Sequence, residues 1–202
     1  MDIKLKIYSD YLCPWCYVGQ GVVDQLKREY DVSVEWSPYL LRPDMPPEGM
    51  EIDPYIRDRM TQSRQRLEEM AHTAGMEMVF SEHISNSRRA LEATEYAKEH
   101  GKGEEFHGAV FHKLYGEGKD ISKWDVLRTA AQEVGLDADD MKHEIESDKY
   151  VAVLEEQLAK TTAIGITGVP TYILNDKYKI VGAQPLEAFK DVIARLESET
   201  KK

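Results

Sequence analysis

The tetrapeptide Cys13-Pro14-Trp15-Cys16 constrains this 202-residue chain more than any other stretch, because it contains both of the cysteines. It follows an alternating apolar run at residues 3–9 and precedes apolar residues that recur at helical spacing from 14 to about 29. Two cysteines separated by two residues, placed between a strand and a helix, are typical of a redox site. The sequence therefore predicts a strand-to-helix turn that carries a dithiol.

The predicted position of Cys13 at the start of a helix favours its thiolate form. Unpaired backbone N–H groups and the positive end of the helix dipole stabilise negative charge there. Pro14 suits the first helical position, because its φ is fixed near the helical value and an N–H there would have no partner. Cys16 lies one turn further on, within reach of a disulfide with Cys13. We therefore predict that Cys13 attacks and that Cys16 resolves.

Two other uses of the cysteine pair fit the sequence less well. A structural zinc site needs four ligands, so the pair would have to recruit two of the six histidines. A structural disulfide would be a weak cross-link, because so short a loop gains little chain entropy. We favour redox catalysis and expect no metal.

The net charge of −11 argues against nucleic acid and anionic membranes as partners, because the field of the protein repels phosphates. No apolar run reaches the length of about 18 residues that marks a membrane span. The alternating pattern at residues 1–7 is also unlike a signal peptide. These features predict a cytoplasmic protein, and in that compartment a Cys-x-x-Cys pair is usually catalytic, redox-sensing or metal-bound.

The chain begins and ends with β-structure. Residues 3–9, 14–29 and 32–40 predict a strand, a helix and a second strand parallel to the first. Residues 168–174 and 178–182 predict an antiparallel hairpin around a polar turn. Gln184-Pro185 then starts a final helix with one apolar stripe, formed by Leu186, Phe189, Ile193 and Leu196.

The middle of the chain, from Pro43 to about residue 165, predicts helices and no strand. Capping residues and glycines mark where these helices begin and end. The predicted starts are Asp53-Pro54, Asn86 or Ser87, Glu104, Ser122, Asp137 and Asp148, and the first four helices end near Gly75, Gly101, Gly116 and Gly135. We therefore expect an α/β domain, residues 1–44 and 166–202, interrupted by a helical insertion at 45–165.

Motifs at both ends of the chain resemble a known fold. A Cys-x-x-Cys after the first strand, with Val169-Pro170-Thr171-Tyr172 opening a ββα tail, resembles the thioredoxin fold. The helical insertion makes the chain similar to the DsbA family. Residues 9–19, 167–171 and 181–185 are similar to the FrnE-like branch, whose relatives include 2-hydroxychromene-2-carboxylate isomerases and kappa-class glutathione transferases. The resemblance covers nearly the whole chain and is most specific at its two ends.

This resemblance implies an α/β thioredoxin fold with a βαβ head, a ββα tail and a large all-helical insertion. It also implies that the Val169-Pro170 bond is cis and faces the Cys13 sulfur. The backbone of Val169 would then pair with an extended substrate as a short β-bridge, while Pro170 presents no N–H to the thiolate. The implied activity is thiol-disulfide exchange with a disulfide-containing protein or a small thiol.

Trp15 distinguishes the dipeptide between the cysteines from that of the strongly oxidising DsbA-type site, which this site otherwise resembles. That site carries a histidine where Trp15 stands, so a cationic or hydrogen-bonding neighbour is missing from the dipeptide here. We predict a Cys13 pKa below the roughly 8.5 of a free thiol and above the roughly 3.5 of the strongest oxidants. An intermediate reduction potential should follow.

Two acidic residues are candidates for steering the proton that Cys16 must lose. Asp10 lies three residues before Cys13, and Glu35 lies on the second predicted strand. Acidic residues near strand ends are more often solvated or capping groups than acid-base catalysts. Their role in the site is therefore left open.

A third set of candidates lies in the insertion. Asn86 begins a motif that resembles an Asn-Ser/Thr motif near the active cleft of the isomerase and transferase relatives. A plain helix N-cap also explains Asn86, and we favour this explanation. Three arginines are candidates for contacts with a glutathione carboxylate, namely Arg42, Arg88 and Arg89.

Two other functions compete with dithiol chemistry. The isomerase and transferase relatives have serine at the position of Cys13 and lack the second cysteine, so retention of both favours a dithiol enzyme. No organic cofactor is expected, although glutathione is a candidate co-substrate. A non-catalytic binding module would use a pliable methionine surface, which core packing explains more simply, at Met70, Met76 and Met78. The direction of electron flow and the choice between monomer and homodimer stay open.

Overall fold

The alternating residues near the N-terminus form a strand that is buried on one face. The computed structural model describes residues 2–59 and 61–200. Strand β1 (Ile3–Ser9) is followed by helix α1 (Pro14–Glu29) and strand β2 (Val32–Pro38). β1 and β2 are parallel, with Ile3 opposite Val32 and Ser9 opposite Pro38. The predicted βαβ opening is therefore confirmed.

The C-terminal segment completes the sheet. Strands β5 (Thr171–Leu174) and β6 (Tyr178–Val181) form the predicted antiparallel hairpin, and β5 also pairs antiparallel with β1. The sheet order is β2-β1-β5-β6. Helix α9 (Leu186–Thr200) buries its apolar stripe in the same cluster as β1 and α1. This arrangement, with β5 beside β1, brings the second half of the fold next to the cysteine turn.

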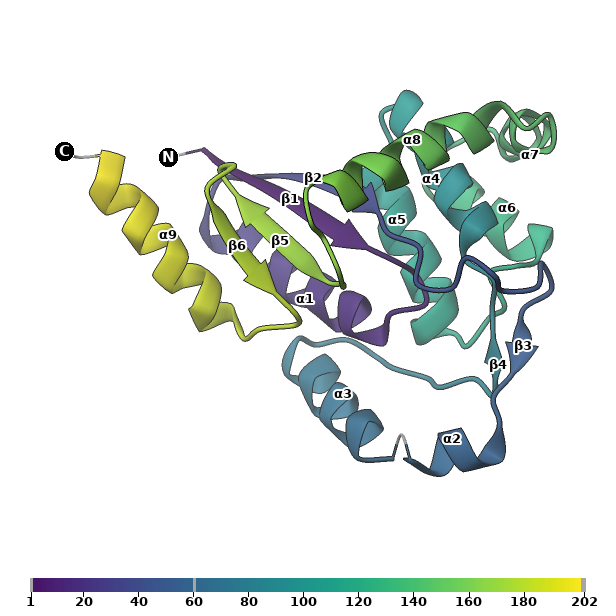
Figure 1. Cartoon of the computed structure of the whole chain (residues 1–202), viewed down its shortest axis with the longest axis horizontal. Coiled ribbons are helices and arrows are strands. Elements are labelled where there is room, and N and C mark those ends of the chain that lie inside the picture. The colour runs from purple at the N-terminus through teal and green to yellow at the C-terminus, as the bar shows by residue number, and fades with distance from the viewer. Residues whose placement is uncertain (1, 60, 201–202) are drawn as a thin grey trace.

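The insertion is mainly helical and lies largely beyond the β2 edge of the sheet, away from α9 (Figure 1). Helices α5 and α8 contact β2, and α3 contacts α1. The helices are α2 (Pro54–Arg59), α3 (Thr61–Thr73), α4 (Arg88–Glu99), α5 (Gly103–Phe111), α6 (Trp124–Glu133), α7 (Ala138–Glu146) and α8 (Lys149–Ala163). The expected domain boundaries at 44/45 and 165/166 stay a prediction.

The expectation that the middle contains no strand is wrong. Strands β3 (Met50–Glu51) and β4 (His83–Ile84) pair antiparallel. Each has only two residues, too few for an alternating pattern to appear in the sequence. The single helix predicted from Pro54 to Gly75 is found as α2 and α3, and residue 60 between them lies outside the described residues.

The predicted helix starts have mixed outcomes. Asp137 caps α7, because its carboxylate accepts hydrogen bonds from the N–H groups of Asp139 and Asp140, both at 3.0 Å. Ser122 is not the cap of α6, since Lys123 holds that position and the Ser122 hydroxyl instead donates to Asp120. Asp148 precedes α8 but makes no side-chain cap.

The helix predicted from Glu104 to Tyr115 changes its winding. α5 ends at Phe111, and the chain continues as a π-helix, η1 (His112–Gly116). The wider turn rotates Tyr115 relative to its place in an α-helix. Hydrophobic periodicity predicts the helix but not this local change.

Two apolar clusters meet at the cysteine turn. One lies between the sheet, α1 and α9, and the other fills the insertion. Cys13 and Cys16 belong to the insertion cluster although they lie on α1 or next to it. Met70, Met76 and Met78 are partly buried against that same cluster, which favours core packing over a binding surface.

Gly19 allows α1 to approach the sheet closely. A Cβ atom at this position would lie 2.1 Å from the Tyr172 hydroxyl oxygen. Tyr172 is 1% exposed and packs edge-on against Phe189, so its rigid ring has little room to move. The contact between α1 and β5 therefore requires glycine.

We predict that Gly19→Ala lowers the free energy of unfolding by about 1–3 kcal/mol through overpacking. Chemical denaturation measures this change. Gly168→Ala is the matched control, because a Cβ at Gly168 meets no heavy atom within 4 Å. That variant should stay within about 0.5 kcal/mol of the parent. Equal stabilities of the two variants would show that the Tyr172 ring can move aside without loss of stability.

Candidate active site

The fold places Cys13 at the N-cap of α1 and beside the start of β5. Cys13 and Cys16 are free thiols with exposed fractions of 5% and 1%. The Cys13 thiol donates to the carbonyl oxygen of Val169 at 3.5 Å, and the Val169–Pro170 peptide bond is cis. The structure thus brings the Cys13 motif and the Val169-Pro170 motif together, as the sequence indicates.

The two thiols have opposite pKa shifts. A hydrogen bond from the Cys16 thiol, followed by backbone N–H groups of Cys16 and Trp15, lowers the pKa of Cys13 against the effect of burial. Burial, followed by the interaction with Cys13, raises the pKa of Cys16 well above its usual range. The direction for Cys13 agrees with the helix N-terminus argument, but the neighbouring thiol contributes more than either backbone N–H group alone. Cys13 is therefore the thiol that ionises first.

Asp10 organises the turn that precedes Cys13. Its buried carboxylate accepts hydrogen bonds from the N–H groups of Leu41 at 2.6 Å and Leu12 at 3.1 Å. Burial raises the pKa of Asp10, and its charge in turn raises the pKa of Cys13. The carboxylate also interacts with the side chain of Ser87, and its backbone contacts join the cysteine turn to the segment after β2, so Asp10 holds the turn in place.

Pro14 and Trp15 face different surroundings. Trp15 is partly buried, and the Arg66 guanidinium lies 5.4 Å from the centre of its ring. Pro14 helps to line an apolar groove between the cysteine turn and the insertion, together with Leu12, Val79, Phe80, Leu114 and Tyr115. An apolar group could therefore lie directly beside the cysteine pair.

Sequence reasoning missed the tyrosines that fasten the turn to the insertion. The Tyr115 hydroxyl donates to the carbonyl oxygen of Leu12 at 2.9 Å, and Tyr17 donates to Glu77 at 2.7 Å. Burial raises the pKa of Tyr115 well above its usual range, so it stays a neutral donor. No signal in the sequence identifies Tyr115, because the π-helix that positions it is not visible in the apolar periodicity.

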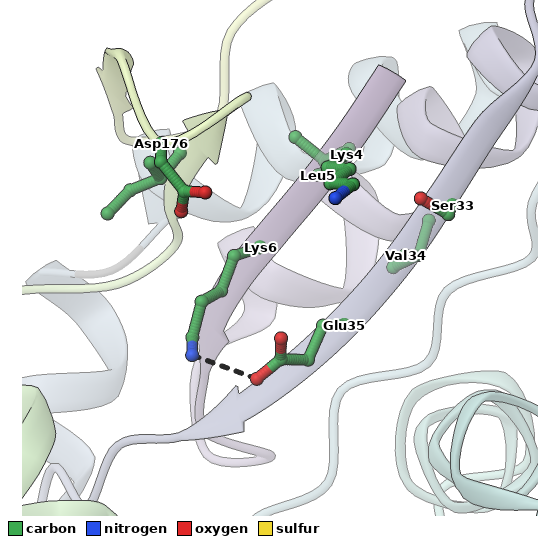
Figure 2. A pocket seen from close by; sticks show the side chains of 8 residues that line it. Lys4, Leu5, Lys6, Ser33, Val34, Glu35 and Asp176 are labelled. Atoms are coloured by element: carbon green, nitrogen blue, oxygen red, sulfur yellow. Dashed lines mark ion pairs between the residues drawn. The ribbon is translucent and has the colours of Figure 1, made fainter. Parts of the chain in front are cut away.

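Glu35 does not belong to the cysteine site. It forms an ion pair with Lys6 at 2.8 Å, beside a hollow on the sheet (Figure 2). Lys6 and Glu35 are register partners, and side chains alternate along a strand, so both lie on the opposite face from Ile7 and the α1 core. Glu35 is therefore no candidate for moving the Cys16 proton.

The insertion candidates are occupied by contacts within the protein. Asn86 donates to the carbonyl oxygen of Met45 at 2.8 Å and accepts from the Arg88 N–H at 2.8 Å, which supports the start of α4. Arg88 pairs with Glu155, and Arg89 donates to the carbonyl oxygen of Ser122. These residues line a hollow whose walls do not include the cysteine turn.

The remaining candidate, Arg42, is exposed and donates to the Met50 sulfur at 3.6 Å. Within residues 2–59 and 61–200, no group of three or more His, Cys, Asp or Glu side chains could hold a metal ion. In the same part of the chain, no helix is long and apolar enough to cross a membrane.

The pKa shifts generate a testable prediction. Cys16→Ala should raise the pKa of Cys13, because the thiolate loses the hydrogen bond that lowers it most. The midpoint of Cys13 alkylation by iodoacetamide, followed against pH, should move to higher pH. Cys16→Ser is the control, since a hydroxyl keeps a donor and should shift the midpoint less. An unchanged midpoint in Cys16→Ala would assign the whole effect to the backbone.

Comparisons with known proteins agree with this geometry. A model of the DSBA-like thioredoxin domain family matches residues 4–194. The uncharacterized protein YwbO of Bacillus subtilis is 34% identical over 198 residues, which cover 96% of this chain and 97% of that protein. A 2-hydroxychromene-2-carboxylate isomerase of Sphingobium xenophagum is 25% identical over 187 residues, 88% of this chain and 91% of that enzyme.

A solved structure shows the same fold. The probable DsbA oxidoreductase of Streptomyces coelicolor superposes with a TM-score of 0.87 at 21% identity, over 98% of this chain and 91% of that one. The thioredoxin fold and the relation to the isomerase branch, both implied by the sequence motifs, are thereby confirmed. The chain belongs to the family of DSBA-like thioredoxin domains.

Proposed function

We propose that this protein is a thiol-disulfide oxidoreductase that uses the Cys13-Pro14-Trp15-Cys16 pair on protein or small-molecule disulfides. The observation that carries the proposal is the pair of buried free thiols at the start of α1, with the Cys13 sulfur 3.5 Å from the Val169 carbonyl oxygen. The pKa shifts of the two thiols, in opposite directions, support it. A lowered pKa makes Cys13 a nucleophile, and a raised pKa keeps Cys16 protonated until it is needed. This division of roles is what dithiol exchange requires.

The proposed reaction has two steps. The Cys13 thiolate attacks one sulfur of the substrate disulfide, so a mixed disulfide forms and the other substrate sulfur leaves as a thiolate. Cys16 then loses its proton and attacks the Cys13 sulfur, which releases the second substrate sulfur. The two electrons pass from the dithiol to the substrate, and the enzyme ends with a Cys13–Cys16 disulfide. Oxidation of a substrate dithiol is the same sequence in reverse.

The segment before β5 is the proposed substrate contact. The Val169 carbonyl oxygen lies 3.5 Å from the Cys13 sulfur, so a substrate sulfur bonded to Cys13 would lie beside the Val169 backbone. An extended substrate could form a short β-bridge with it, which reads the backbone rather than the side chains. Pro170 brings no N–H to the thiolate. The apolar groove at Pro14 would take an apolar side chain next to the disulfide.

We further propose that the reaction needs no organic cofactor, that glutathione can serve as a small thiol co-substrate, and that the protein works in the cytoplasm. Glutathione keeps exposed thiols reduced in that compartment. The only two cysteines of the chain form the reactive pair, so no structural disulfide has to be maintained there. The small thiol would return the pair to its dithiol form by exchange.

A second candidate function is a glutathione-dependent isomerase or transferase. The similarity to the enzyme named 2-hydroxychromene-2-carboxylate isomerase favours it. Against it, relatives of that branch have serine where this chain has Cys13. The two candidates differ in what they require of Cys16, because only dithiol exchange uses it.

We predict that Cys16→Ser abolishes multiple-turnover reduction of insulin or of glutathione disulfide, because the mixed disulfide at Cys13 can no longer be resolved within the protein. The rate of disulfide reduction, followed by absorbance and by trapping of the released thiols, measures this loss. Cys13→Ser is the companion variant and should lose even the first attack. A Cys16→Ser protein that keeps the parent rate would contradict dithiol exchange. Glutathione-dependent isomerase or transferase activity that is unchanged in Cys16→Ser would support the second candidate.

The reduction potential of the pair identifies the direction of electron flow. Equilibration in graded glutathione buffers, followed by tryptophan fluorescence and thiol trapping, should show one reversible two-thiol transition. We expect a potential between those of thioredoxin, about −270 mV, and the strongest oxidants, about −120 mV. A value near the first would indicate a reductase. The absence of a two-thiol transition would contradict the proposed function.

A further inference from the structure

Three residues that line one hollow each have a buried polar atom without a conventional hydrogen-bond partner among residues 2–59 and 61–200. The atoms are Ser9 Oγ, Trp36 Nε1 and His107 Nδ1. The three residues are 3%, 5% and 3% exposed. Buried polar atoms nearly always have partners, so three in one place indicate a bound group.

The three residues line one narrow slot. It runs along the end of β2, and its walls also include Pro38, Glu95 and Lys98. The slot leaves ≈ 10 Å³ in which the centre of a water molecule can move. That space is about what one water needs, and a buried water typically makes about three hydrogen bonds. The slot therefore matches a single water in size and in number of partners.

The hydrogen-bonding character of the three atoms is also complementary to one water. Trp36 Nε1–H can only donate, so the water must accept from it. Burial and the nearby Lys98 charge lower the pKa of His107 well below its usual range, so the imidazole is neutral. Trp36 stacks on His107 with ring centres 3.8 Å apart, which holds the ring in place. With its proton on Nε2, His107 accepts at Nδ1, and the Ser9 hydroxyl takes the third position.

Ser9 connects this slot to the chemistry. Its hydroxyl interacts with the Cys16 thiol and lowers the pKa of that thiol, against the larger effect of burial. The other titratable groups that face Cys16 are Cys13, Tyr115 from η1 and Tyr172 from β5. Both tyrosines stay protonated because burial raises their pKa values well above the usual range, so neither can accept a proton.

The carboxylate of Asp10 is not placed to accept the Cys16 proton. Its oxygens are bound by the N–H groups of Leu12 and Leu41, and the influence of Asp10 on Cys16 comes from its backbone N–H. Ser9 thus joins Cys16 to the slot, whose walls also include the charged side chains of Glu95 and Lys98, which are 7% and 30% exposed.

We propose that the slot binds one water molecule, held by Ser9, Trp36 and His107, and that Ser9 and this water carry the proton of Cys16 out of the protein during the resolving step. The proposal rests on the proposed dithiol function. As the Cys16 proton moves to Ser9 Oγ, the Ser9 hydroxyl proton moves to the water and on to solvent at the Glu95 and Lys98 end. The electron pair left on the Cys16 sulfur forms the bond to Cys13, and the substrate sulfur leaves as a thiolate.

This route separates proton and substrate. The substrate sulfur leaves on the Val169 side of Cys13, whereas the slot is lined by the ends of β1 and β2 and by helices α4 and α5. Proton loss therefore does not require solvent to enter between the thiols and the bound substrate. Ser9 contacts the reacting Cys16 thiol and carries its proton, whereas Trp36 acts as a positioning residue that holds the water.

The two steps can be timed separately with dithiobis(nitrobenzoate), which releases one coloured thiolate when Cys13 attacks and a second when Cys16 resolves. In Ser9→Ala and Trp36→Phe, the first phase should keep its rate and the second should slow by about tenfold or more. The pH at which the second phase is half-maximal should also rise, a change that loss of packing alone would not produce. Ser122→Ala is the matched control, because it removes a buried hydroxyl that donates to Asp120, outside the slot, and should leave both phases unchanged.

Unchanged second phases in both variants, with circular dichroism showing folded protein, would overturn the proposal. A parent protein without a second phase would instead contradict the proposed dithiol function.

Two measurements on the parent protein need no variant. Nitrogen NMR should show neutral His107 with its proton on Nε2, and a high-resolution crystal structure should show one water within hydrogen-bonding distance of the three atoms. A dry slot or a proton on His107 Nδ1 would overturn the proposal.

Discussion

The proposed chemistry of this protein depends on the shared burial of two thiols at the start of one helix. Negative charge on one sulfur disfavours charge on the other, and little water is present to screen it. The N–H groups of the first helical turn and the hydrogen bond from Cys16 then decide that Cys13 carries the charge. An exposed pair would lose this asymmetry, because solvent would stabilise either thiolate. For the proposed reaction, burial is therefore the condition for having one nucleophile and one resolving thiol.

The helical insertion supplies much of that burial. Cys13 and Cys16 pack in the same apolar cluster as Phe111 and Leu114, which lie far from them in the sequence. Tyr115 fastens the turn by its bond to the Leu12 carbonyl, and His107 forms the back wall of the slot. The insertion is thus part of the site and not only a cover over the thioredoxin fold. The sheet alone could not bury the thiols in this way, because its face at Lys6 and Glu35 points away from them.

The sequence predicts the βαβ head, the ββα tail and the cysteine pair well, because these depend on local signals. Alternation, a first-turn proline and two-residue cysteine spacing act within a few residues. It does not predict the β3–β4 pair, since two-residue strands carry no pattern. Nor does it predict the winding of η1, which follows from packing between segments distant in the chain. Ser9, Trp36 and His107 escape notice for the same reason, since only the fold brings their polar atoms together.

The charges around the pair explain why Trp15 need not make the site strongly oxidising or strongly reducing. No cation lies in the dipeptide itself, but the Arg66 guanidinium lies over the Trp15 ring. A cation near the thiolate stabilises the reduced form and makes the pair more oxidising, whereas ionised Asp10 has the opposite effect. Arg66 is exposed and screened by salt, while Asp10 is fully buried and screened little. Asp10 therefore opposes the lowering of the Cys13 pKa by Cys16 and the helix N–H groups, and the intermediate potential stays a prediction.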